Sequence, residues 1–204
     1  MNASVLVTHA MSRNEKVGAV ALATAGLFSL VLTHFTASLA PLRLVALALA
    51  AFAAWCLCDE LGMRKPLNRA GFVFFAIAVA VRVQIALGVA PEFVGRYYLL
   101  YAGFLLTALL FWSVAFLHRK RASKVVGAVG VLASLAPIVA LVIGHLALGT
   151  GAFFGIGAIL SSTEGAAPID LSYVTLIDRI FGLWCYLSAW LLWRGHVRSC
   201  TLPQ

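Results

Sequence analysis

Two apolar stretches of the sequence each contain a pair of polar side chains, in places where such groups are unusual. Arg82 and Gln84 lie in one stretch, and Asp178 and Arg179 lie in another. A charged side chain inside a membrane is costly, so it normally faces other helices and pairs with a group of opposite charge. These residues are therefore the first candidates for an ion pair between helices or for a ligand-binding site.

The positions of Arg82 and Asp178 within their stretches predict that the two charges lie at the same depth. Arg82 lies about eight residues from the outer end of its stretch and Asp178 lies a similar distance from the outer end of its own, roughly 10 Å below the outer surface at a rise of about 1.5 Å per residue. We therefore predict an ion pair between Arg82 and Asp178, and expect Arg179 to bind a backbone carbonyl, Gln84 or water. The pair either fixes two helices in register or belongs to a site for a small anionic ligand, since two arginines accompany one aspartate.

Two histidines, His34 and His145, lie closer to the same outer edge than these charges do. Histidines that face each other across adjacent helices are suited to binding haem iron. Near a membrane surface, however, histidine more commonly serves as an interfacial side chain with a polar tip. We therefore expect no cofactor and no metal site. A haem- or quinone-linked redox subunit is the alternative, and an absorption spectrum of the purified protein tests it.

The sequence contains no motif that predicts an enzyme. It lacks a Gly-rich phosphate loop, a His-Glu-x-x-His pattern, a Gly-x-Ser-x-Gly elbow and a Cys-x-x-Cys pair. Asp59 and Glu60 are adjacent carboxylates, but no nucleophile or metal-ligand pattern accompanies them. We therefore predict a non-enzymatic membrane protein, either a small permease-like protein or an accessory subunit of a membrane complex. An intramembrane enzyme that uses the polar residues near the outer surface is the alternative.

The composition indicates that lipid, rather than water, surrounds these stretches. Hydrophobic residues make up 63% of the chain and charged residues 11%, whereas a soluble domain carries about 25% charged residues. The formal net charge is +8, but the basic residues fall between the apolar stretches and form no aromatic-interleaved face that would bind nucleic acid. The partners that we expect are the lipid bilayer and other membrane subunits or further copies of the chain.

Apolar runs of about 20 residues cross the hydrocarbon core of a membrane, and the sequence contains about six of them. We therefore predict an all-α, polytopic transmembrane helical bundle that forms a single domain over 1–204. The first run is too long for a signal peptide, so we expect it to remain as an uncleaved span. The predicted spans are 17–38, 42–62, 70–90, 97–117, 125–147 and 172–193.

The basic residues of the connections predict the orientation of the bundle. Cytoplasmic loops collect Lys and Arg, so the basic side is the cytoplasmic side and both termini lie there. We accordingly place the protein in a bacterial cytoplasmic (inner) membrane, with a short apolar segment near 149–160 that is re-entrant or interfacial because it is too short to cross. The connections on the basic side contain Arg13 and Lys16, then Arg64, Lys65 and Arg69, then Arg119, Lys120, Arg121 and Lys124, and finally Arg194 and Arg198, whereas the opposite side has only Arg43 and Arg96.

Overall fold

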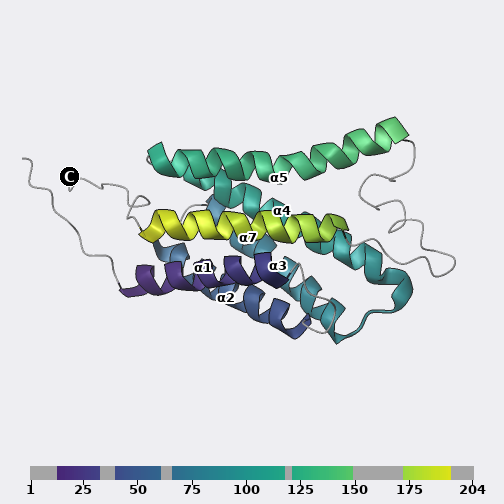
Figure 1. The fold of residues 1–204 in the computed structure, drawn as a ribbon, viewed down its shortest axis with the longest axis horizontal. Coiled ribbons are helices and arrows are strands. Elements are labelled where there is room, and N and C mark those ends of the chain that lie inside the picture. The colour runs from purple at the N-terminus through teal and green to yellow at the C-terminus, as the bar shows by residue number, and fades with distance from the viewer. Residues whose placement is uncertain (1–12, 33–39, 61–65, 118–120, 149–171, 194–204) are drawn as a thin grey trace, which may run out of the picture.

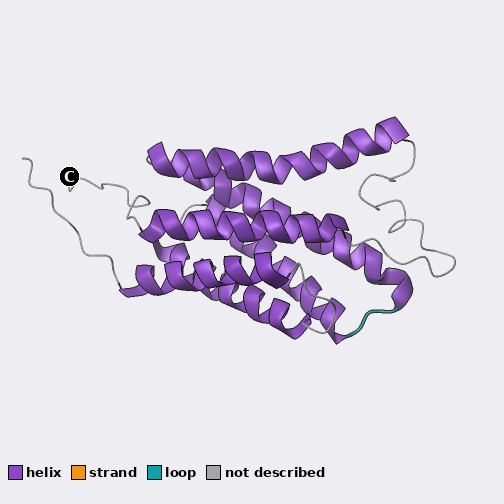
Figure 2. Cartoon of the chain, in the orientation of Figure 1, coloured by secondary structure: helices purple, strands orange, loops and turns teal. Residues whose placement is uncertain are grey.

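The computed structural model describes residues 13–32, 40–60, 66–117, 121–148 and 172–193. Within these ranges the chain forms helices and no strands, which confirms the predicted all-α class (Figure 2). The segment near 149–160, which we expected to be re-entrant or interfacial, lies outside the described residues. The helices are α1 (Arg13–Leu32), α2 (Ala40–Glu60), α3 (Pro66–Leu87), α4 (Pro91–Leu117), α5 (Arg121–Leu148) and α7 (Ser172–Trp193), as Figure 1 shows.

Three of these helices are long and apolar enough to cross a membrane, which supports a membrane location for the chain. They comprise Pro66–Leu87, Phe93–Leu117 and Val174–Trp193. In the other three helices the described apolar segments are shorter than a full span, so the number of six spans and their orientation stay predictions. Those shorter segments are Lys16–Val31, Leu44–Ala53 and Lys124–Val139.

Proline and glycine explain where α3 and α4 begin and end. Pro66 and Pro91 are the first residues of their helices, a position where the fixed φ of proline suits a helix and its missing N–H removes no hydrogen bond. Helix α4 therefore starts at Pro91 rather than at the predicted 97. Helix α3 stops at Leu87, before the predicted 90, and is followed by Gly88, whose φ of 106° favours glycine over residues with a Cβ.

Helix α7, the last described helix, packs against α1, the first described helix, and so brings the two ends of the described chain together. It packs most extensively against α1, and it also contacts α4 and α5. In Figure 1, α7 lies between α1 and α5, and these three helices run along the long axis of the molecule. Helix α3 packs mainly against α4, and α2 packs against α1. The residues at opposite ends of the sequence, 13–32 and 172–193, are therefore direct neighbours.

Helices α1 and α7 come close enough for their backbones to touch at Gly26 and Gly182. A Cβ added at Gly26 would lie 2.7 Å from the carbonyl oxygen of Gly182, and one added at Gly182 would lie 2.9 Å from that of Gly26. Small residues at helix contacts allow this close approach, which drives much of helix association inside membranes. The contact is reciprocal, so neither position has room for a side chain.

Replacement of Gly26 by alanine should lower the stability of the protein. The added methyl group forces α1 and α7 apart, and overpacking of this kind typically costs about 1–3 kcal/mol. The measurement is thermal unfolding of the purified protein in mild detergent. Gly103→Ala in α4 is the matched control, because no atom lies within 4 Å of its added Cβ, and we expect equal or slightly higher stability there. Equal melting temperatures for both variants would contradict the proposed contact.

Candidate functional site

Arg82 is a buried cation enclosed by two tyrosine rings. Its side chain is only 6% exposed, in the last turns of α3. The guanidinium carbon Cζ lies 4.9 Å from the ring centroid of Tyr98 and 5.3 Å from that of Tyr101. These tyrosines are three residues apart on α4, so they present adjacent rings to α3. Cation–π attraction of this kind is strongest where water is excluded, as it is here.

Tyr101 connects this cation to α7. Its hydroxyl donates a hydrogen bond to Oδ1 of Asp178 over 2.6 Å, a length typical of a charge-assisted bond. The hydroxyl of Ser29 in α1 donates to the backbone carbonyl of Asp178 over 2.9 Å. Four helices therefore meet at one polar cluster. We call Arg82, Tyr98, Tyr101, Asp178 and Ser29 the Arg82 cluster.

The charges of the Arg82 cluster balance each other within the protein. Burial disfavours the charge of Arg82, and the negative charge of Asp178 opposes that effect. The nitrogen Nη1 of Arg82 is buried and has no hydrogen-bond partner among the described residues. Two aromatic faces and a nearby carboxylate thus compensate the charge of Arg82, whereas its Nη1 donor has no hydrogen-bond partner among the described residues.

The structure brings two of the four polar residues from the sequence analysis to one place. Arg82 and Asp178 both contact Tyr101, as described above. Gln84 and Arg179 are exposed instead. Because residues two apart on a helix point about 200° apart, Gln84 cannot share the direction of Arg82.

The two histidines that we considered as haem ligands are not described at side-chain level. His34 lies outside the described residues. His145 belongs to α5, but its side chain lies outside the described part of the chain. The haem hypothesis therefore remains as the sequence left it.

Sequence reasoning did not select Tyr98, Tyr101 or Ser29. A usable signal was present, because the spacing of Tyr98 and Tyr101 puts them on one helix face and a buried tyrosine hydroxyl normally has a hydrogen-bond partner. Ser29 offers no such signal. A serine in an apolar helix commonly bonds to its own backbone, and only the packing of α1 on α7 directs it to Asp178.

Beside the Arg82 cluster, aromatic rings fill the space between α3, α4 and α7. We call these five rings the ring stack. Phe75 lies two turns before Arg82 on α3, and Phe181 follows Asp178 by one turn on α7. Ring pairs at these separations add attraction beyond the area that they bury. The centroid distances are 5.7 Å for Phe75–Phe181, 5.4 Å for Phe75–Trp112, 5.9 Å for Trp112–Trp184 and 5.7 Å for Phe116–Trp184.

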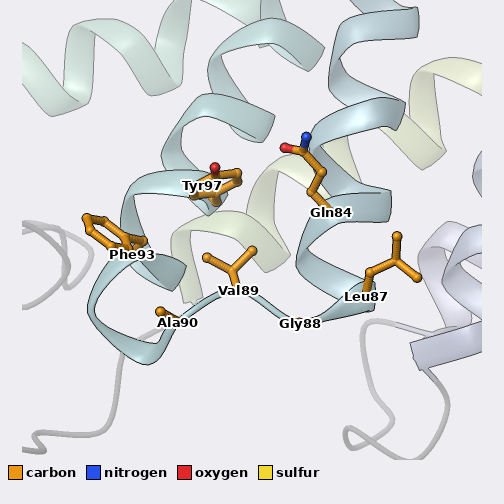
Figure 3. Close-up of a pocket in the computed structure, with 7 residues that line it drawn as sticks. All are labelled: Gln84, Leu87, Gly88, Val89, Ala90, Phe93 and Tyr97. Atoms are coloured by element: carbon orange, nitrogen blue, oxygen red, sulfur yellow. The ribbon is translucent and has the colours of Figure 1, made fainter.

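Helices α3 and α4 also form a groove, shown in Figure 3, where the loop 88–90 joins them. Its volume of about 510 Å³ falls in the range of small-molecule sites. Gln84 and Tyr97 lie on facing helices above the loop and supply the polar groups, while the other walls are mainly apolar. We call this the α3–α4 groove. It is lined by Gln84, Leu87, Gly88, Val89, Ala90, Phe93 and Tyr97.

The polar groups of the Arg82 cluster can bind and position charged or hydrogen-bonding partners. The Arg82 cluster combines a cation, a carboxylate and hydroxyl groups, and the described residues contain no group of three His, Cys, Asp or Glu that could hold a metal ion. The chain matches no protein-family model, and comparison with curated proteins and with solved structures finds no significant similarity. The role of the cluster has to be inferred from its own geometry.

Removal of the Tyr101 hydroxyl should destabilise the bundle. Tyr101→Phe keeps the ring beside Arg82 but deprives the Asp178 carboxylate of a partly buried hydrogen bond, and a hydrogen bond to a charged group typically contributes about 1.5–3 kcal/mol. The measurement is thermal unfolding in mild detergent. Tyr186→Phe is the matched control, because Tyr186 is 51% exposed on α7 and removal of its hydroxyl should change the stability of the protein little. Equal effects at both positions would show that the bond to Asp178 contributes nothing specific.

Proposed function

We propose that the chain is a non-enzymatic integral membrane protein that serves as an accessory subunit of a larger complex in a bacterial inner membrane. Its six helices span the membrane with both termini on the cytoplasmic side. Three apolar helices of spanning length support the membrane location, and the basic connections support the orientation. The other three helices complete the bundle.

The Arg82 cluster acts in this proposal as the element that holds α3, α4, α7 and α1 in one arrangement. The observation that carries it is the placement of Arg82 against Tyr98 and Tyr101, with Tyr101 bonded to Asp178. Groups of the protein itself, rather than a ligand, compensate the charge of Arg82 in this arrangement. The neighbouring ring stack fills the interior between the helices. Transporters instead place broken helices around a central site. The packing therefore favours a scaffold subunit over a conduit.

A small permease-like or ligand-binding protein is the second candidate. The α3–α4 groove favours it, because it offers the amide of Gln84 and the hydroxyl of Tyr97 within a cavity of suitable size. The unused Nη1 donor of Arg82 would suit an anionic ligand at the Arg82 cluster, but it is buried and does not line this groove. An intramembrane redox enzyme is a third hypothesis. It requires haem ligation by His34 and His145, or a quinone bound near the outer surface.

Exchange of the two charges separates the first two candidates. Arg82→Asp and Asp178→Arg each leave a buried charge uncompensated, which typically costs about 3–5 kcal/mol, so we expect both single variants to lose folded protein. The double variant restores opposite charges at the two positions and should regain part of it, although the carboxylate at position 82 meets the negative faces of Tyr98 and Tyr101. Each protein is purified from native membranes in mild detergent, and its melting temperature and the particle with which it elutes are recorded.

The scaffold proposal predicts that the wild type and the double variant elute with partner subunits at a fixed stoichiometry. Arg96→Asp is the control, because Arg96 is exposed and its guanidinium lies 5.9 Å from the ring centroid of Phe93, away from the cluster. If Arg82→Asp melts like the wild type, the structural role is wrong. If the protein elutes without a partner, the permease-like candidate replaces the subunit proposal.

Reporter fusions test the proposed orientation. Green fluorescent protein folds only when it stays in the cytoplasm, and alkaline phosphatase is active only outside it. We expect fluorescence from a fusion at the C-terminus and phosphatase activity from an insertion in the loop 88–90, which joins α3 and α4 on the opposite side. The reverse pattern would overturn the assignment of the basic side to the cytoplasm.

A further inference from the structure

A second groove lies between α1 and α7, and it shares no lining residue with the α3–α4 groove. Its volume is about 180 Å³. Helix α1 contributes small side chains to it, whereas α7 contributes aromatic ones whose rings remain 45–59% exposed. We call this the α1–α7 groove. It is lined by Ala19, Val20, Ala23, Tyr186, Ala189, Trp190 and Trp193.

The glycine contact closes one end of this groove. Helices α1 and α7 touch at Gly26 and Gly182, and the groove begins about one turn beyond, toward the start of α1 and the end of α7. Its lining runs from Tyr186 to Trp193 on α7, a rise of roughly 10 Å at about 1.5 Å per residue. One leaflet contributes half of a hydrocarbon core of about 30 Å. The groove therefore fits within one lipid leaflet.

A positive charge and an indole mark the open end of the groove. Lys16 is exposed and precedes Ala19 and Val20 by one helical turn, so it lies on the same face of α1 as the groove. Trp193 ends α7 beside it, and indole rings favour the level of lipid headgroups. Lysine at this level attracts anionic headgroups, and its flexible stem can follow the apolar surface to reach them.

We propose that the α1–α7 groove binds an anionic phospholipid from the leaflet at the basic end of the bundle, with the first part of one acyl chain between α1 and α7 and the phosphate beside Lys16. A transmembrane helix from a partner would pack along both leaflets, whereas the lining of this groove is shorter than one leaflet. The proposal requires that the chain is embedded in a membrane. It is independent of the role of the Arg82 cluster and of any partner subunit.

Tryptophan fluorescence in lipid nanodiscs tests this binding, because bromine atoms on an acyl chain quench indoles that they touch. The starting protein carries Trp55→Phe, so that Trp190 and Trp193 are the exposed tryptophans and Trp112 and Trp184 are only 6% exposed. Brominated phosphatidylglycerol and brominated phosphatidylcholine are each titrated into the discs. One lysine near the surface favours the anionic lipid by roughly fivefold, so half-maximal quenching should need about fivefold less phosphatidylglycerol.

Two pairs of variants locate the effect. Lys16→Gln should abolish the preference for phosphatidylglycerol, whereas Lys124→Gln, which removes an exposed lysine near the start of α5 at the same end of the bundle, should keep it (Figure 1). Ala23→Phe fills the groove and should reduce quenching by both lipids. Ala128→Phe, at an exposed position of α5, should leave quenching unchanged.

Three results would overturn the proposal. Equal quenching by the two lipids in the starting protein removes the anionic preference, and an unchanged preference in Lys16→Gln removes the role of that lysine. Protection of Trp190 and Trp193 from both lipids, with disulfide-linked dimers of a Trp193→Cys variant, would assign the groove to a second copy of the chain. The lysine pair decides the question even if Ala23→Phe does not fold, because both lysines are exposed.

Discussion

A guanidinium buried inside a membrane bundle needs its compensating groups within the protein, because the surrounding lipid offers none. Arg82 meets this requirement with two aromatic faces on α4 and with a carboxylate on α7 that is bonded to one of the same tyrosines. Each of these groups compensates the charge of Arg82 only when the rotation of its helix turns it toward the guanidinium. The electrostatic balance of one side chain therefore constrains the arrangement of α3, α4 and α7 together.

The rest of the packing agrees with that constraint. The ring stack begins two turns from Arg82 on α3 and one turn from Asp178 on α7, so the same rotations that bring the polar groups together also bring the rings into contact. On the other side of α7, the glycine contact lets α1 come close enough for Ser29 to reach the carbonyl of Asp178. Polar, aromatic and small-residue contacts thus support one arrangement of helices.

The helices were accessible to sequence reasoning because a helix that crosses a membrane needs a characteristic length and an apolar composition, which three of them have. The predicted span 172–193 coincides with α7, and the starts of α3 and α4 follow from Pro66 and Pro91 once proline is recognised as a first helical residue. The common depth of Arg82 and Asp178 also follows from counting residues. Their connection through Tyr101 does not, because it depends on the rotation of three helices that no local pattern specifies. The separation of Gln84 from Arg82 was available from helical geometry alone.

The contact between Gly26 and Gly182 has a mechanical consequence. It lies between the α1–α7 groove on one side and the bond from Ser29 to Asp178 on the other. The backbones approach most closely at this contact, so a change in the crossing angle of the two helices about it moves both of its sides at once. A wider occupant of the groove would therefore strain the hydrogen bond from Ser29 to Asp178 on the far side of the contact. Occupancy of the groove and the polar contacts of Asp178 would be linked through the contact between Gly26 and Gly182.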